Sequence, residues 1–177
     1  RSLEMARLSP GKAEFLNIDG DVIEKPLTQI TWDAEAAEKG GYEHFMMKEI
    51  YEQPEALRKT ISPRIREGKI VLDDITLTRE QIQNTRKVCI VACGTAYHVG
   101  VVAKYAFERL LKIPLEVDVA SEFRYREPIL DENTLVIIIS QSGETADTLA
   151  ALRMAKAKGC RILSIVNVVG STIAKPD

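Results

Sequence analysis

The sequence predicts an α/β fold in which helices flank a doubly wound parallel sheet, preceded by a β-hairpin and a helical linker. Residues 78–177 alternate short apolar runs with stretches whose apolar residues recur every three or four positions. Two of the runs, Lys87–Cys93 and Thr134–Ile139, are almost continuously apolar. Such runs are typical of strands buried on both faces of a parallel sheet, and their alternation with helices places helices on both sides.

Composition excludes several classes of protein. The 177 residues carry 24 Lys+Arg and 26 Asp+Glu, a net charge of -2 that argues against a general nucleic-acid binder. No apolar run approaches the roughly 20 residues of a membrane span, and Arg1–Lys12 lacks the apolar core of a signal peptide. Three cysteines without metal-ligand spacing indicate reduced thiols. We therefore expect a cytoplasmic protein with no metal, cofactor, membrane or nucleic-acid partner.

The first segment, residues 1–33, is predicted to be β structure. Ala13–Ile18 and Asp21–Glu24 flank Asp19-Gly20, a dipeptide typical of hairpin turns, and Thr28–Trp32 has the pattern of another short strand. A hairpin alone is marginal in water. The segment is therefore either the end of a larger β domain or a hairpin that packs on the rest of the chain.

The second segment, residues 34–77, is predicted to be mostly helical. A helix at 34–39 is capped by Asp33 and broken by Gly40-Gly41, and Tyr42–Gln53 resumes the helix. Pro54 suits the first turn of a new helix that Pro63 ends. We expect Met46-Met47 to be core and His44 to pack on a helix.

The third segment, residues 78–177, contains the predicted parallel sheet. Thr78–Gln81 has the pattern of a capping box that opens a short helix. Pro114 and Gly159 mark the ends of the two longer helices. The predicted strands are Lys87–Cys93, Leu115–Val119, Thr134–Ile139 and Arg161–Val166, and the helices between them are Ala96–Leu110 and Ala146–Ala157.

Two loops rich in glycine and hydroxyl residues leave strands of this sheet and enter helices. They are Cys93–Ala96 and Ser140–Thr145. Ligands of open α/β sheets bind at the carboxyl ends of the strands, and backbone N–H groups and hydroxyls at a helix N-terminus suit a phosphate. The alternative is that Ser and Thr here are ordinary helix caps. Neither loop fits a nucleotide-binding motif, so a monophosphate on a small molecule is the better ligand.

We expect the other reactive side chains to have structural rather than chemical roles. Cys93 could be a thiolate near a helix N-terminus, but no base or acid partner can be assigned to it, so we favour a supporting thiol. Cys89 and Cys160 lie in or beside strands and are expected in the core. His98 is expected to be packed or at the surface, and Glu144 to favour the dipole of the helix that follows.

The loops also carry a family resemblance. The run Ser140–Thr148, Ser-Gln-Ser-Gly-Glu-Thr-Ala-Asp-Thr, resembles the phosphosugar-binding signature of sugar isomerase (SIS) domains, which have a flavodoxin-like fold. Together with Ala92–His98 and Glu38–Met46, it resembles the glutamine–fructose-6-phosphate aminotransferase family over nearly the whole chain. In that family a glutaminase domain releases ammonia, and two SIS domains isomerise and aminate fructose 6-phosphate to glucosamine 6-phosphate.

The resemblance implies a domain organisation and a site. Residues 1–33 resemble the end of the glutaminase domain, 34–77 the linker and lead-in helices, and 78–177 most of the first SIS domain. Ala96 stands where many members have Ser. The implied contacts of a sugar phosphate, fructose 6-phosphate or glucosamine 6-phosphate, are Thr95, Ala96, Ser140, Gln141, Ser142 and Thr145.

The family's catalytic groups do not map onto this chain. The glutamine-cleaving cysteine would precede Arg1, and the isomerising groups and the Schiff-base lysine would follow Asp177. The resemblance therefore implies a chain that grips phosphate without catalytic residues, in a protein that is a homodimer. A non-catalytic SIS sensor of phosphosugars and an inert structural fragment remain as alternatives.

Overall fold

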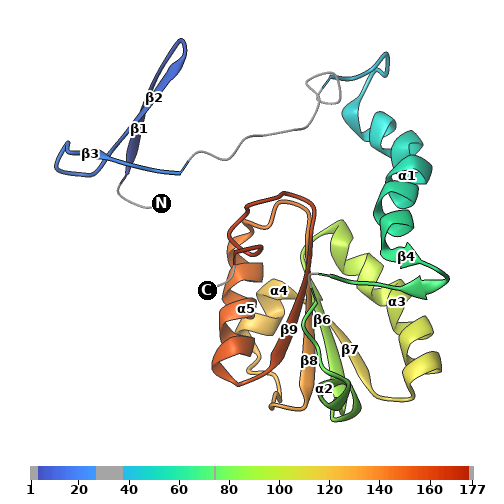
Figure 1. Ribbon diagram of the computed structural model, residues 1–177. Helices are drawn as coiled ribbons and strands as arrows, with labels where there is room; N and C mark the ends of the chain where they lie inside the picture. Colours follow the sequence, from blue (N-terminus) through green and yellow to red (C-terminus); the bar gives the residue numbers. More distant parts are fainter. Residues whose placement is uncertain (1–3, 27–37, 74, 176–177) are drawn as a thin grey trace. The chain divides into compact units, whose positions relative to one another are not determined.

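The computed structural model describes residues 4–26, 38–73 and 75–175. The chain divides into two compact units, Arg1–Val71 and Leu72–Asp177 (Figure 1). The predicted strand at Thr28–Trp32 and the first four residues of the predicted helix at 34–39 lie outside the described residues.

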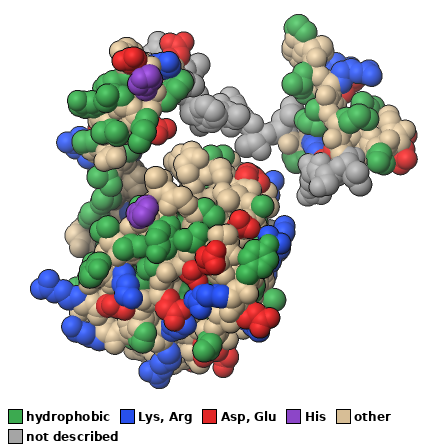
Figure 2. Space-filling model, turned by 180° about the vertical axis from the view of Figure 1, so that it is seen from behind, with side chains coloured by type: hydrophobic (Ala, Val, Ile, Leu, Met, Phe, Trp, Pro, Cys, Tyr) green, Lys and Arg blue, Asp and Glu red, His purple; other side chains and the backbone are tan. Residues whose placement is uncertain are grey.

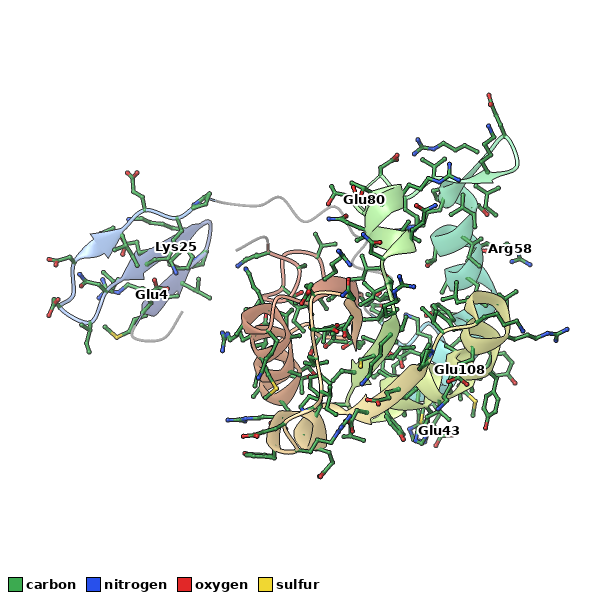
Figure 3. All side chains as sticks on the ribbon, turned by 90° about the horizontal axis from the view of Figure 1, so that it is seen from below. Glu4, Lys25, Glu43, Arg58, Glu80 and Glu108 are labelled. Atoms are coloured by element: carbon green, nitrogen blue, oxygen red, sulfur yellow. The ribbon has the colours of Figure 1, made fainter. Side chains whose placement is uncertain are left out.

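The first unit begins with a small antiparallel sheet. Its strands, in the order β1-β2-β3, are β1 (Met5–Ser9), β2 (Lys12–Leu16) and β3 (Val22–Ile23). The predicted hairpin is confirmed by the pairing of β2 with β3, and the side-chain oxygen of Asn17 accepts the backbone N–H of Asp19 and Asp21 in the turn. An ion pair between Lys25 and Glu4 joins the two ends of this sheet (Figure 3). No pattern predicts β1, because all of its residues are exposed.

The linker helix differs from the prediction of two helices. Helix α1 (Phe45–Ile61) is continuous, with Pro54 inside it. A proline inside a helix removes one N–H donor and crowds the preceding turn, which costs about 3 kcal/mol. About two helical turns on each side of Pro54 offset this cost through their cooperative hydrogen bonds. The helix ends before Pro63, as predicted, and a 3-10 turn at Ser62–Arg64 follows. Two short paired strands, β4 (Ile65–Arg66) and β5 (Lys69–Ile70), complete the unit.

Two expectations for the start of α1 are wrong. Met46 and Met47 are 72% and 45% exposed, so they are not core residues. His44 occupies the position before the helix and is also exposed, so it does not pack on a helix. An apolar run does not by itself report burial, since Ile50, Tyr51, Leu57 and Ile61 of α1 are exposed as well.

The larger unit contains the predicted doubly wound sheet. Its four parallel strands, in the order β7-β6-β8-β9, are β6 (Lys87–Ala92), β7 (Leu115–Val119), β8 (Thr134–Ser140) and β9 (Arg161–Val166). Helix α3 (Thr95–Leu111) covers one face, and α4 (Ala120–Tyr125) and α5 (Ala146–Ala157) cover the other (Figure 1). A short helix, α2 (Arg79–Gln83), precedes the sheet and has the predicted capping box at Thr78.

Alternate residues of the central strands supply the two cores. Val88 and Ile90 pack beneath α3, whereas Cys89 and Val91 point to the opposite face, beneath α4 and α5. The helix α4 is not predicted by the sequence, because a helix of six residues is too short to show a helical period. Its Phe123 is fully buried and fills the core between α4 and α5.

Gly100 sets the distance between α3 and the sheet. A Cβ at this position would lie 2.8 Å from Ile90 Cγ2 and 2.8 Å from Val117 Cγ1. Gly100→Ala should therefore lower the free energy of unfolding by about 2 kcal/mol, because overpacking costs up to about 3 kcal/mol while alanine regains about 1 kcal/mol of helix propensity. Urea denaturation measures this. Ala106→Gly, at an exposed position of the same helix, reports the propensity effect alone. A variant at Gly100 as stable as the parent would contradict the close contact.

Candidate functional site

The two predicted loops meet at one edge of the sheet. Strands β6 and β8 are neighbours, with Ala92 opposite Ile139. The chain leaves β6 for α3 and returns at β7, and it leaves β8 for α5 and returns at β9. The connections diverge between β6 and β8, so this is the topological switch point, where ligands of such sheets bind.

The β6–α3 loop presents the N-terminus of a long helix. Gly94 precedes α3 with φ +58° and ψ -136°, a conformation that is essentially restricted to glycine. Thr95 is exposed and begins the helix, and Ala96 is half-buried behind it. Among the described residues no side chain caps this helix. The first turn therefore presents N–H groups and a partial positive charge at the carboxyl end of β6.

The β8–α5 loop, residues 140–145, is shaped by its own hydroxyl groups. Ser140 is buried, and its Oγ accepts the N–H of Gly143 at 2.9 Å. Ser142 is half-buried, and its Oγ accepts the N–H of Glu144 at 3.2 Å. A hydroxyl that accepts one hydrogen bond still has a hydrogen to donate. Gln141 is exposed between the two serines.

Thr145 completes the loop at the start of α5. It occupies the N-cap position, where no side chain among the described residues makes a capping hydrogen bond. Asp147 in the first turn is paired with Arg124 of α4 at 3.1 Å, and both side chains are partly exposed, so the pair contributes little to stability. Cys93 Sγ lies 3.5 Å from Thr148 Oγ1, so the supporting thiol links the end of β6 to α5. This contact joins the chain just before the β6–α3 loop to the helix that follows the β8–α5 loop.

Glu144 has a partner that the sequence does not reveal. Its Oε1 accepts the backbone N–H of Thr172 at 2.7 Å, and its Oε2 accepts the hydroxyl of the same residue at 2.7 Å. These hydrogen bonds from Thr172 hold the pKa of the Glu144 carboxyl below its ordinary value. The sequence suggested only a dipole role, because nothing in the motif points to a residue 28 positions away.

The cysteines other than Cys93 are core residues, as expected. Cys89 and Cys160 are 1% and 9% exposed. Burial raises the pKa of the Cys89 thiol to about 11 and also raises the pKa of the Cys160 thiol. Both thiols are therefore protonated at neutral pH and are not nucleophiles.

The six predicted residues offer hydroxyl, amide and backbone N–H groups to an anion. The six predicted residues lie on two loops at adjacent strand ends, and all are uncharged side chains. Within residues 4–26, 38–73 and 75–175 there is no cluster of three metal-binding side chains. No helix of this part of the chain is long and apolar enough to cross a bilayer. On the visible face of the larger unit, side chains of both charges are intermingled (Figure 2).

The doubly wound sheet with its two hydroxyl-rich loops has the architecture expected of an SIS domain. The family model described as SIS domain matches residues 81–177, and the chain belongs to this family.

The individual relatives indicate a narrower group of proteins than the SIS family. The chain is 61% identical over 173 residues to the glutamine–fructose-6-phosphate aminotransferase [isomerizing] of Clostridium acetobutylicum, covering 97% of this chain and 28% of that one. It is 56% identical to the corresponding protein of Caldanaerobacter subterraneus subsp. tengcongensis, with the same shares covered. The structure of the C-terminal domain of glucosamine-fructose-6-phosphate aminotransferase from Francisella tularensis superposes with a TM-score of 0.70 at 46% identity, over 77% of this chain and 38% of that one. The chain spans about 28% of the length of the curated relatives.

Proposed function

We propose that this chain is the phosphosugar-binding part of a glutamine–fructose-6-phosphate aminotransferase (isomerizing). That enzyme makes glucosamine 6-phosphate from fructose 6-phosphate and glutamine. The chain grips the phosphate of substrate and product, while groups outside it carry out the chemistry at the sugar. The identity of 61% to such an enzyme and the meeting of the two loops at the switch point both support this role.

The observation that carries the proposal is that two helices begin directly after neighbouring strand ends, at one edge of the sheet. Helices α3 and α5, of 17 and 12 residues, begin at the ends of the neighbouring strands β6 and β8. Each helix N-terminus carries about half a positive charge. Together with the hydroxyl groups of the two loops, they compensate a phosphate dianion without Lys or Arg.

The predicted residues take distinct roles in this grip. Ser142, Thr145 and Thr95 donate hydroxyl hydrogen bonds to the phosphate, and Gln141 donates its side-chain amide. Ser140 is buried and acts mainly by fixing the turn through Gly143. Ala96 contributes its backbone N–H, because it has no hydroxyl.

We also propose a domain organisation, an oligomeric state and a cellular location for the protein. Residues 1–33 belong to a glutamine amidotransferase domain, 34–77 to the linker and lead-in helices, and 78–177 to the first SIS domain. The protein acts in the cytoplasm as a homodimer, and its partner is a sugar phosphate rather than a nucleic acid or a membrane. No cofactor or metal has a role in this grip.

Ser142→Ala tests the grip directly. Removing a hydroxyl that donates to a charged phosphate should weaken fructose 6-phosphate binding about tenfold to a hundredfold, because such a hydrogen bond is worth about 1.5–3 kcal/mol. Amide NMR titration of the 177-residue chain with fructose 6-phosphate measures the affinity and, through peak dispersion, the fold.

A matched control is Ser164→Ala, the same substitution at an exposed position of β9. It should leave the affinity unchanged. The proposed function would be overturned if the parent chain gives dispersed peaks but none of them moves when fructose 6-phosphate is added. Movement confined to residues outside the two loops would place the site elsewhere.

A further inference from the structure

A carboxylate lies within a loop that we assign to phosphate binding. Glu144 sits between Ser142 and Thr145, where its negative charge opposes that of a phosphate. Its side chain is exposed, yet both carboxylate oxygens are engaged with Thr172, each at 2.7 Å. Thr172 belongs to the β9 loop, residues 167–174, which follows β9. Because the charge of Glu144 alone would weaken phosphate binding, its contact with Thr172 indicates a structural role.

The β9 loop is joined to the β8–α5 loop at further points. The N–H of Val168 donates to the carbonyl of Gln141 at 3.3 Å, and the N–H of Ile173 donates to the carbonyl of Gly143 at 3.1 Å. Ser171 is 3% exposed and lies directly against Gly143. Of these hydrogen bonds, only the one between Glu144 and the Thr172 hydroxyl joins two side chains, so substitution of either residue removes it.

We propose that Glu144 is a positioning residue that, through Thr172, holds the β9 loop against the β8–α5 loop and keeps the latter in its phosphate-binding shape. The inference rests on the proposed function. Glu144 does not touch the phosphate. The carboxylate accepts an N–H and an O–H from Thr172, so hydrogen bonds from the β9 loop compensate its charge.

A purely electrostatic role makes the opposite prediction. If Glu144 acted only through its charge, any neutral replacement would remove repulsion and tighten phosphosugar binding. If it acts through Thr172, Glu144→Ala weakens binding, because both hydrogen bonds are lost. Glu144→Gln is equally neutral, but its amide can still accept the Thr172 N–H and donate to the hydroxyl oxygen. The glutamine variant therefore recovers most of the affinity that the alanine variant loses.

The experiment is an amide NMR titration of the 177-residue chain with fructose 6-phosphate. We expect affinity about tenfold weaker for Glu144→Ala and several-fold weaker for Thr172→Val, as for the loss of ordinary hydrogen bonds. The double variant should be no weaker than Glu144→Ala, because the two side chains act as one contact. Hydrogen exchange at the Thr172 and Ile173 amides should be faster in Glu144→Ala.

Asp147→Ala is the matched control, since it removes the same charge three residues further along and instead breaks the pair with Arg124. It should bind fructose 6-phosphate as tightly as the parent or more tightly. If Glu144→Ala or Glu144→Gln binds more tightly than the parent, or if Asp147→Ala loses as much affinity as Glu144→Ala, the positioning role is overturned while the proposed function stands. If Glu144→Ala does not fold, unchanged affinity of Thr172→Val overturns it. A parent chain that does not bind overturns the proposed function and this inference with it.

Discussion

Gly143→Ala is expected to abolish phosphosugar binding and to lower the free energy of unfolding by about 3 kcal/mol. A Cβ at this position would lie 2.1 Å from Ser171 Oγ, 2.6 Å from Ser171 Cβ and 2.8 Å from Val166 Cγ1. The φ of +67° adds about 1–2 kcal/mol of backbone strain for any residue with a Cβ. Overpacking accounts for the rest. The β9 loop cannot withdraw easily, because Ile173 is hydrogen-bonded to the Gly143 carbonyl.

A second substitution separates the steric contact with Ser171 from the backbone strain at Gly143. Ser171→Gly in the Gly143→Ala background removes the two closest contacts but leaves the backbone strain and the Val166 contact. We expect this double variant to regain part of the stability and measurable binding, as determined by urea denaturation and by NMR titration. Binding by the single variant at the affinity of the parent would show that the β8–α5 loop does not form the site.

The central strands could be predicted from sequence because their burial leaves no choice of residue type. Strands β6 and β8 are covered on both faces, so nearly every position must be apolar, and their predicted ends agree with the structure to within one residue. The strand β1 and the helix α4 could not be predicted in this way. The residues of β1 are all exposed, and α4 buries only Ala120 and Phe123.

Pro54 shows a different limit. A proline near a possible helix start reads as a boundary, because it suits the first turn and disfavours helix in the residue before it. In α1 the same residue lies inside a helix of 17 residues. The balance depends on the turns on either side and on their cooperativity, which a local pattern does not report.

Part of the candidate site could be predicted because its residues directly follow strands that are easy to recognise. Glycine and hydroxyl residues directly after a buried strand are local signals, and they place Thr95 and Ser140–Thr145 at one edge of the sheet. Glu144 and Thr172 are far apart in sequence and belong to different loops. Their contact follows from the pairing of β8 with β9, so it appears only once the fold is known.

Gly94→Ala is expected to weaken fructose 6-phosphate binding at least tenfold and to lower the free energy of unfolding by about 1–3 kcal/mol. Unlike Gly143, Gly94 has open space where a Cβ would be, with no atom within 4 Å. The whole effect therefore comes from the backbone, because φ +58° with ψ -136° is essentially open to glycine alone. A residue with a Cβ relaxes toward an allowed conformation and turns the first N–H groups of α3 away from the crevice. Their interaction with a phosphate is then lost.

Gly159→Ala separates backbone strain from the loss of the site. Gly159 has φ +76° and also has no atom within 4 Å of the Cβ position, but it follows α5 at the opposite end of that helix. It should lower the free energy of unfolding by about 1–2 kcal/mol without changing the affinity for fructose 6-phosphate. If both variants lose stability and only Gly94→Ala loses binding, the conformation of Gly94 serves the ligand. Equal affinity in the two variants would remove the β6–α3 loop from the site and leave the grip to the N-terminus of α5.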